Sequence, residues 1–262
     1  MTLAAEIARL KLDWIVPDWP APANVRALVT TRNGGVSTGP CATMNLARNA
    51  IDNPEHVAQN KALLRAVIGV DPVWMSQVHG TDVVTIDTPP SMPIGDAAVA
   101  TKPGRVVAVR IADCLPVLFC DRAGTTVAAA HAGWRGLSAG ILEATIARMP
   151  VAPGELLAWM GPAIGPQKFE VGDDVRDAFL ARDSAAASAF KPHPEHEHKW
   201  LADIFALASM RLAAAGVTAQ SGGGLCTVSN PDRFFSHRRD KSPGRMAALI
   251  WLESSMPQSC RR

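Results

Sequence analysis

The sequence predicts an α/β protein in which helices cover mixed β-sheets. The chain has 262 residues, a length that allows one large domain with a substantial buried core. Hydrophobic residues make up 48% of the chain and charged residues 19%, and both kinds are spread over its whole length, as in ordinary globular proteins. Segments with strand and helix patterns alternate along the chain, and this alternation favours helices layered over the faces of sheets. We therefore expect one domain over residues 1–262.

Strand patterns occur in short apolar runs with turn-forming residues at their ends. These runs are residues 25–31, 106–111, 115–120, 125–130, 156–160 and 245–252. Two shorter extended pieces lie between residues 73 and 86 and flank a glycine-containing corner at residues 77–82. His79 is therefore expected at a corner, Cys114 at the break between two buried strands, and His131 just after the end of the 125–130 strand.

Helix patterns alternate with these strands. Asn53 offers an N-terminal cap, Pro54 suits the first helical position, and an apolar stripe leads to Gly69, so a helix of about four turns is expected there. Further helices are expected over residues 137–149, from residues 172–174 onward, and over residues 201–215.

The charge pattern argues against a nucleic-acid partner. The formal net charge is +2, and the largest basic groups are Arg238, Arg239 and Lys241 and the terminal pair Arg261 and Arg262. A protein that binds nucleic acid through its phosphates needs a more extended basic surface.

Cysteine usage and the N-terminal segment favour a cytoplasmic protein. Residues 1–12 carry charged side chains within their apolar pattern and do not resemble a signal peptide, and no run is apolar enough to span a membrane. The cysteines are widely spaced and odd in number, which is typical of a reducing compartment. They are Cys41, Cys114, Cys120, Cys226 and Cys260. We expect no membrane partner, and we favour a monomer.

Three side chains that bind borderline metals, His79, Cys114 and His131, are expected at the ends of structural elements, where folds display reactive groups. Two imidazoles and one thiolate leave the fourth position of a tetrahedral zinc ion open, as in catalytic zinc sites. Spacings of 35 and 17 residues match no short metal-binding motif, so spacing alone leaves structural histidines and a structural cysteine as the plainer alternative.

Five motifs resemble those of one known family. They are Thr31-Arg32-Asn33-Gly34-Gly35-Val36-Ser37, Gln77-Val78-His79-Gly80, Ala112-Asp113-Cys114-Leu115-Pro116-Val117, His131-Ala132-Gly133-Trp134-Arg135-Gly136 and Gly161-Pro162-Ala163-Ile164-Gly165. Together and in this order they are similar to the YfiH-like family, long described as multicopper polyphenol oxidase or laccase and now as purine nucleoside phosphorylase. The similarity covers about residues 25–252, so residues 1–24 are expected to form a peripheral extension.

The resemblance implies an α-β-β-α layering, a zinc ion held by His79, Cys114 and His131, and copper as a less favoured metal. It also implies phosphorolysis of inosine, adenosine and methylthioadenosine, together with adenosine deaminase activity, so a nucleoside and phosphate are the expected small-molecule partners. The stretch His193-Pro194-Glu195-His196-Glu197-His198 is the least typical part of the chain. It is expected to be a solvated loop, although its three imidazoles offer an adventitious metal site.

Several polar residues are candidates for binding substrate. The helix that begins near residues 133–136 offers unpaired backbone N–H groups, and Arg135 adds a guanidinium group beside them, so an anion is expected to dock there. The alternative is that Arg135 only seals the turn. Arg32, Asn45 and Arg238 are further candidates for contacts with phosphate or sugar, and we rank Arg32 above Arg238.

Two carboxylates, Asp113 and Glu170, are candidates for proton transfer because they lie nearest to the motifs. Glu170 is also a candidate for substrate binding. For Asp113, the capping of a turn is the alternative.

Other functions remain open at this point. Cys114 as a nucleophile, with His131 or His79 as its base, would make a metal-free cysteine hydrolase or amidase. The resemblance contains this alternative, because some family members have been assigned to correcting misincorporated serine in peptidoglycan precursors. A laccase needs several coppers and many more ligands than the seven histidines of this chain supply. A binding module without catalysis is the third alternative, and it predicts that Cys114→Ala leaves function intact.

Overall fold

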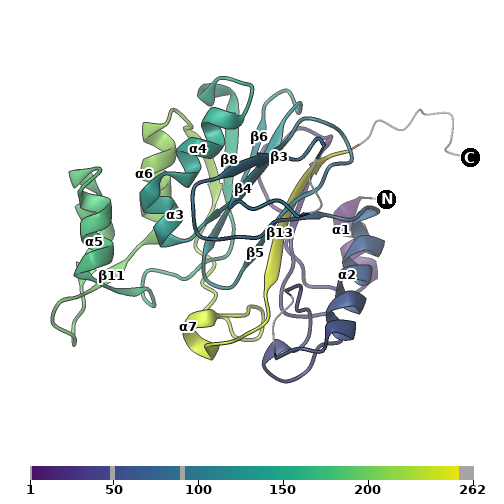
Figure 1. Ribbon diagram of the computed structural model, residues 1–262, viewed down its shortest axis with the longest axis horizontal. Helices are drawn as coiled ribbons and strands as arrows, with labels where there is room; N and C mark the ends of the chain where they lie inside the picture. Colours follow the sequence, from purple (N-terminus) through teal and green to yellow (C-terminus); the bar gives the residue numbers. More distant parts are fainter. Residues whose placement is uncertain (1, 48–50, 89–91, 254–262) are drawn as a thin grey trace, which may run out of the picture.

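The computed structural model describes residues 2–47, 51–88 and 92–253, which form four layers in the order helices, sheet, sheet, helices (Figure 1). This arrangement confirms the mixed α/β class that the sequence predicts and the α-β-β-α order that the family resemblance implies. Cys260, Arg261 and Arg262 lie outside the described residues.

A four-stranded sheet forms the second layer, with the strand order β1-β13-β5-β2. Its strands are β1 (Val25–Val29), β13 (Met246–Leu252), β5 (Val107–Ile111) and β2 (Val73–Trp74). β13 runs antiparallel to β1 and β5, whereas β2 runs parallel to β5. Because side chains alternate along a strand, Ala247 and Leu249 of β13 face the first helix layer, while Ala248 and Ile250 face the other sheet.

The first helix layer consists of α1 (Leu3–Arg9) and α2 (Pro54–Ile68). α2 begins where the side chain of Asn53 accepts the N–H of Glu55 and ends at Gly69, whose φ of +83° is left-handed. The N-terminal segment is tied to this layer, because Ile7 and Trp14 are buried in the same cluster as the apolar face of α2.

A six-stranded sheet forms the third layer, with the strand order β12-β8-β6-β7-β4-β3. Its strands are β12 (Ala219–Gly222), β8 (Leu156–Met160), β6 (Leu115–Asp121), β7 (Val127–Ala132), β4 (Ala97–Ala100) and β3 (Val83–Thr85). β6 and β7 pair antiparallel at its centre, and the two outermost pairings are parallel. The core between the two sheets includes Val109 and Ile250 from one sheet and Leu118 and Ala129 from the other.

The fourth layer covers the outer face of the six-stranded sheet with α3 (Trp134–Ala139), α4 (Ile141–Arg148) and α6 (Ile204–Ala214) (Figure 1). Leu142 of α4 and Leu207 of α6 pack with Val117 and Phe119 of β6 in this part of the core.

A smaller antiparallel sheet, β10-β11-β9, lies beside this layer with α5 (Asp173–Leu180). Its strands are β9 (Glu170–Gly172), β10 (Phe190–Pro192) and β11 (Lys199–Ala202). The remaining elements are α7 (His237–Asp240) and the 3-10 helices Gly39–Cys41, Pro153–Glu155 and Ser184–Ala189.

Three element predictions are wrong in detail. The helix expected over residues 137–149 is interrupted at Gly140, whose φ of +109° ends α3 and precedes α4. The helix expected from residue 201 begins only at Ile204, because Asp203 caps it while residues 199–202 pair in β11. The strand expected to end at residue 130 continues to Ala132, so His131 lies inside β7.

β4 carries no strand pattern in the sequence. This strand contains three alanines, a residue with low strand propensity, yet all four of its residues are buried between neighbouring strands. Tertiary burial overrides propensity here. Within the described ranges, no helix combines the length and the apolar character needed to cross a bilayer.

Candidate metal centre

His79, Cys114 and His131 converge on one point although they are distant in the sequence. His79 lies in the loop between β2 and β3, Cys114 between β5 and β6, and His131 near the end of β7. One ligand atom from each of the three side chains lies within 4.8 Å of the other two. The Sγ atom of Cys114 is 3.9 Å from Nε2 of His79, and the two imidazole rings meet edge to face with 4.9 Å between centroids. The structure therefore brings these three predicted ligands together.

A buried carboxylate, Asp96, connects the two histidines. Asp96 immediately precedes β4 and is fully buried. Its Oδ2 accepts the backbone N–H groups of Val78 and Gly80, and its Oδ1 accepts the backbone N–H of His79 and is 2.9 Å from Nδ1 of His131. One side chain thus fixes the loop that carries the first histidine and the ring of the second.

Asp96 also determines which nitrogen of His131 faces the centre. Burial raises the pKa of the Asp96 carboxyl, but the hydrogen bonds from His131 and from the backbone N–H groups outweigh burial and hold this pKa below its usual value. The ionised carboxylate accepts the Nδ1–H of His131, so the remaining ring nitrogen, Nε2, is directed toward the other two ligands. A carboxylate behind a histidine is the usual way in which proteins orient a metal-binding imidazole.

Cys114 and His131 form a thiolate–imidazolium pair in the metal-free protein. Burial favours the neutral thiol, but the positive charge of His131 and hydrogen bonds from both histidines lower the pKa of Cys114 to about 6. Burial likewise disfavours a charged His131, but the Cys114 thiolate and Asp96 raise the pKa of His131 to about 9. The centre therefore stabilises the thiolate, which is both the metal-binding and the nucleophilic form of cysteine.

The backbone at the centre adopts conformations that side chains normally avoid. φ is +62° at His79 and +96° at Asp113, and such conformations persist only where the surrounding structure fixes them. Gly133 is constrained by space, because a Cβ at this position would lie 2.9 Å from Sγ of Cys114 and 3.2 Å from Cδ2 of His79. Only glycine lets the chain pass this close to both ligands.

The donor set fits a zinc ion. Two imidazoles and one thiolate are the ligand types that zinc prefers, and three protein ligands leave one coordination position for water or substrate. The same donors also bind copper.

A second group of metal-type ligands, Glu170, His193 and His196, lies near the surface. Oε2 of Glu170 is 3.3 Å from Nε2 of His193 and 2.8 Å from Nδ1 of His196. Because Nδ1 of His193 accepts the backbone N–H groups of Glu195 and His196, the proton of the neutral ring lies on Nε2, which donates to Glu170. These hydrogen bonds account for the cluster without a metal, in keeping with the solvated loop expected over residues 193–198.

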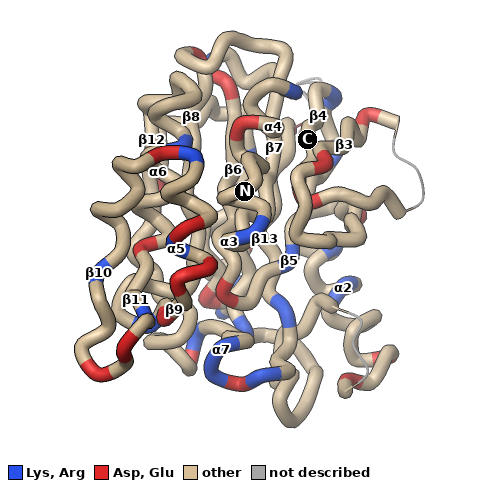
Figure 2. Tube along the Cα trace, turned by 60° about the vertical axis from the view of Figure 1, so that its left-hand side comes forward, with Lys and Arg blue, Asp and Glu red and all other residues tan. Residues whose placement is uncertain are grey.

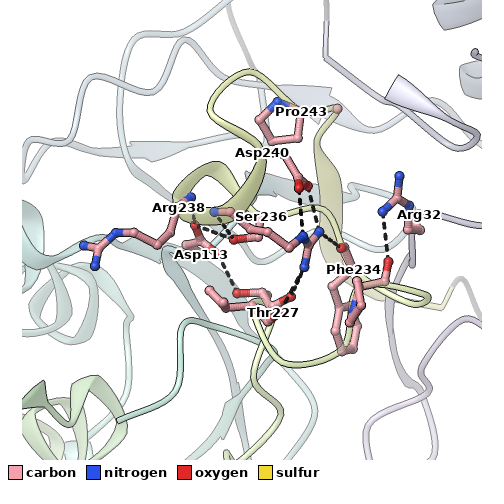
Figure 3. A network of polar contacts seen from close by, with 12 residues as sticks. Arg32, Asp113, Thr227, Phe234, Ser236, Arg238, Asp240 and Pro243 are labelled. Atoms are coloured by element: carbon pink, nitrogen blue, oxygen red, sulfur yellow. Dashed lines mark hydrogen bonds and ion pairs between the residues drawn. The ribbon is translucent and has the colours of Figure 1, made fainter. Parts of the chain in front are cut away.

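The carboxylate of Asp113 is occupied by structural contacts, although the residue precedes Cys114. Oδ1 accepts the hydroxyl of Thr227, and Oδ2 accepts the hydroxyl of Ser236 and the backbone N–H of Arg238 (Figure 3). These bonds tie the β5–β6 loop to the segment that leads into α7. The arrangement corresponds to the turn-anchoring alternative for Asp113.

Arg32 and Asn45 also make contacts within the protein. The guanidinium of Arg32 donates to two backbone carbonyl groups and lies 4.9 Å from the centroid of the Phe235 ring. Asn45 is fully buried, and its Oδ1 accepts the backbone N–H of Arg245. Neither side chain lines the two cavities that meet at the centre.

Two cavities share the wall formed by His79, Cys114 and His237. The first, here called the basic cavity, has a volume of about 470 Å³ and is also lined by Arg110 and Arg245. The second, here called the aromatic cavity, has a volume of about 380 Å³ and is lined in addition by Asp113, Trp134, Phe169, Ile164, Ile204, Arg135 and Arg238. The centre therefore lies between a cationic space and a largely apolar one.

Of the predicted substrate-binding residues, Arg135 and Arg238 line the aromatic cavity. Arg135 is exposed and stacks on Trp134 at 4.4 Å, and Arg238 lies 5.8 Å from the centroid of Phe169 while donating to the backbone carbonyl of Glu170. The carboxylate of Glu170 bonds to the histidine loop described above. The helix that the sequence predicts to begin near residues 133–136, and to bind an anion at its start, is α3, which has six residues.

Four residues near the centre are absent from the site that the sequence predicts: Asp96, Arg110, His237 and Arg245. Arg110 carries a usable signal, since it is the one charged residue in the apolar run 106–111. The sequence offers no comparable signal for Asp96, because Gly95-Asp96 has the composition of an ordinary turn.

Comparison with known proteins places this chain among a group of closely similar sequences. A family model described as multi-copper polyphenol oxidoreductase laccase matches residues 26–253. The chain is 52% identical over 240 residues to purine nucleoside phosphorylase PA4543 of Pseudomonas aeruginosa, and the match covers 92% of this chain and 98% of that protein. It is also 52% identical over 241 residues to purine nucleoside phosphorylase YfiH of Escherichia coli, covering 91% and 98% of the two chains.

Solved structures show the same fold. The crystal structure of protein NMB0706 from Neisseria meningitidis has a TM-score of 0.89 and 49% sequence identity, and the match covers 92% of this chain and 100% of that one. The crystal structure of YfiH from Bacillus licheniformis has a TM-score of 0.82 at 28% identity, with 87% and 93% of the chains covered.

Proposed function

This chain belongs to the YfiH-like purine nucleoside phosphorylase family, and from this premise we propose that it catalyses the phosphorolysis of purine nucleosides at His79, Cys114 and His131. One observation carries the proposal: two of the three converging ligands, His79 and Cys114, line both a cationic and an aromatic cavity, and His131 lines the cationic one. Phosphorolysis needs an anion and a purine held on opposite sides of one reacting carbon, and two adjoining cavities of these characters meet that requirement. The names of the relatives from P. aeruginosa and E. coli support the same reaction.

We propose zinc as the resident metal, with copper as the less favoured ion, and inosine, adenosine and methylthioadenosine as substrates. Bound to His79, Cys114 and His131, zinc would supply Lewis-acid chemistry and an acidified water molecule, which is the chemistry that the proposed adenosine deaminase activity needs. A multicopper centre is not supported, because the chain has seven histidines and three of them lie at residues 193–198.

The protein's own groups divide into those that face substrate and those that hold the site together. Trp134 and Phe169 supply aromatic rings to the cavity proposed for the purine, and the guanidinium groups of Arg135 and Arg238 lie over these two rings. Glu170 is positioned through its backbone contact with Arg238, so we assign it to the rim of the site.

Four polar residues support the site from behind. Asp96 keeps the proton of His131 on Nδ1. Asp113 anchors the loop of Cys114, Asn45 positions the backbone of Arg245, and Arg32 fastens neighbouring loops. We propose positioning roles for these four residues.

We also retain the proposal of one domain over residues 1–262 that acts in the cytoplasm as a monomer. The described cysteines form no disulfide, which supports a reducing compartment.

The test is to incubate the purified protein with inosine in the presence and absence of phosphate and to quantify the products. We expect equal amounts of hypoxanthine and ribose 1-phosphate, a rate that depends on phosphate, and loss of activity in His131→Ala. His198→Gln is a suitable control, because His198 is an exposed histidine that lines neither cavity. Release of free ribose at a rate independent of phosphate, or full activity in His131→Ala, would contradict the proposal.

A cysteine hydrolase or amidase is the second candidate, and one observation favours it. Asp96, His131 and Cys114 form a carboxylate–imidazole–thiolate series, which is the arrangement of a catalytic triad. The two candidates differ in their need for metal. Activity that survives complete zinc removal but is abolished by alkylation of Cys114 would favour the hydrolase.

A further inference from the structure

The basic cavity has no acidic residue in its lining. Its titratable side chains are Arg110, Arg245, three histidines (His79, His131 and His237) and Cys114, whose thiolate is paired with His131. α7 contributes His237, and Figure 2 shows lysine and arginine residues gathered along that helix. A cavity with this lining selects anions over cations and neutral molecules.

Arg110 and Arg245 lie on the same face of the four-stranded sheet. Arg110 of β5 pairs with Ala247 of β13, and Arg245 lies two residues before Ala247, directly before β13 begins, so the two arginines are diagonal neighbours at the end of the β5–β13 pairing. Side chains in this relation reach one another when they are long. Two guanidinium groups therefore face a common space.

Most N–H groups of these two arginines are available to a ligand. Nη2 of Arg110 donates to the carbonyl of Met75, and Nη1 of Arg245 donates to the carbonyls of Pro243 and Gly244. Among the residues that the structure describes, neither guanidinium forms an ion pair with a carboxylate. The planar guanidinium groups of both arginines, which line the cavity, thus keep N–H groups that can donate to a ligand.

Backbone contacts hold both arginines in position. The side chain of Gln77 accepts the backbone N–H of Arg110 and donates to its carbonyl, and Asn45 accepts the backbone N–H of Arg245. Burial and the nearby charge of Arg245 lower the pKa of Arg110, and burial lowers the pKa of Arg245 although the nearby Cys114 and Asp113 charges act to raise it. The metal-free, ligand-free protein therefore keeps two like charges together at a cost that a bound dianion would remove.

We propose that the basic cavity is the phosphate subsite, in which Arg110 and Arg245 bind hydrogen phosphate by charge-assisted hydrogen bonds, while the aromatic cavity takes the purine. This inference rests on the proposed phosphorylase function and specifies its geometry. The ribose then lies at the shared wall of His79, Cys114 and His237.

The assignment gives a balanced reaction. A phosphate oxygen forms the new bond to C1′ of the ribose, and the bond from C1′ to the purine nitrogen breaks, leaving its electron pair on the purine. The proton of hydrogen phosphate ends on the purine, so the products are ribose 1-phosphate and the free base. Arg110 and Arg245 hold the attacking anion and exchange no proton, because guanidinium groups stay charged.

The test is calorimetric titration of the metal-loaded protein with inorganic phosphate, without nucleoside. Arg110→Gln and Arg245→Gln are each expected to weaken phosphate binding by about tenfold or more, since each removes a charged donor pair. Arg110→Lys keeps the charge but not the fork and is expected to be intermediate. Arg26→Gln, on β1 of the same sheet and paired with Glu253, is the control.

Kinetics with inosine supply a second readout. The arginine variants should raise the KM for phosphate much more than the KM for inosine, and melting temperatures should identify any variant that fails to fold. Phosphate binding within about twofold of the parent protein in both glutamine variants would overturn the subsite. Arginine-dependent phosphate binding without phosphorolysis would instead leave the subsite standing and refute the phosphorylase function.

Discussion

Asp96→Asn is expected to weaken metal binding without changing any proposed ligand. The carboxylate of Asp96 accepts four hydrogen bonds, two on each oxygen. Asparagine offers one acceptor oxygen and one NH₂ group, so whichever way the amide turns, its NH₂ faces groups that themselves donate. One buried N–H left without an acceptor costs about 1–3 kcal/mol in the free energy of unfolding.

The effect on the metal follows from the protonation of His131. If the amide oxygen stays with the N–H groups of Val78 and Gly80, its NH₂ group faces Nδ1 of His131 and makes that nitrogen an acceptor. The ring proton then moves to Nε2, and this tautomer cannot bind a metal through Nε2. Losing the carboxylate behind a ligating histidine typically weakens metal affinity by about 10–100-fold, or about 1.4–2.8 kcal/mol.

Zinc affinity should be measured by competition with a chromophoric chelator, and stability by urea unfolding of the metal-free protein. Asp121→Asn is the matched control, because Asp121 is also buried and accepts the backbone N–H groups of Thr125 and Thr126, but it lies at the end of β6 away from the cavities. We expect both variants to lose stability and only Asp96→Asn to lose zinc affinity. A zinc dissociation constant for Asp96→Asn within about threefold of the parent value would refute this reasoning.

Three further predictions concern the same centre. Gly133→Ala should displace Cys114 and His79 and so lower zinc affinity. Gly154→Ala is the control, because a Cβ at that position meets nothing within 4 Å. Equal zinc affinity in the two variants would contradict the packing argument. In the metal-stripped protein, Cys114 should react with iodoacetamide at a rate that is nearly constant from pH 8 to about pH 7 and falls to about half near pH 6, because half of the group is thiolate at its pKa. A rate that still rises between pH 7 and pH 9, measured by mass spectrometry, would count against it. Asp113→Asn should lower the free energy of unfolding, measured with urea, by about 1–3 kcal/mol, while the folded protein keeps its kcat. Unchanged stability with a large loss of kcat would instead indicate that Asp113 transfers protons.

The sequence predicts most individual elements of this fold well because they follow from local patterns, whereas the order of the layers is implied only by the family resemblance. The cap at Asn53 and the stop at Gly69 define α2, and the apolar runs define β1, β5, β6, β8 and β13. The pattern fails where tertiary contacts decide. Alanine-rich β4 becomes a strand through burial between its neighbours, and Leu201 pairs in β11 although its spacing fits the following helix.

The sequence predicts the metal ligands of the candidate site, but not the residues that hold those ligands in position. His79, Cys114 and His131 stand out because they occupy motif positions at the ends of expected elements. Asp96 does not, because it reaches the two histidines only through the pairing of β4 with β7. Arg245 likewise meets Arg110 only because β13 returns from the end of the chain to lie beside β5.

Anomalous X-ray diffraction at the zinc absorption edge, from crystals of the zinc-loaded protein, tests the central claim most directly. We expect a strong peak about 2.0–2.4 Å from Nε2 of His79, Sγ of Cys114 and Nε2 of His131, and its loss in Cys114→Ala crystals. Fully loaded crystals with no peak between these three atoms, or with zinc only at Glu170, His193 and His196, would contradict the claim that they form the metal centre.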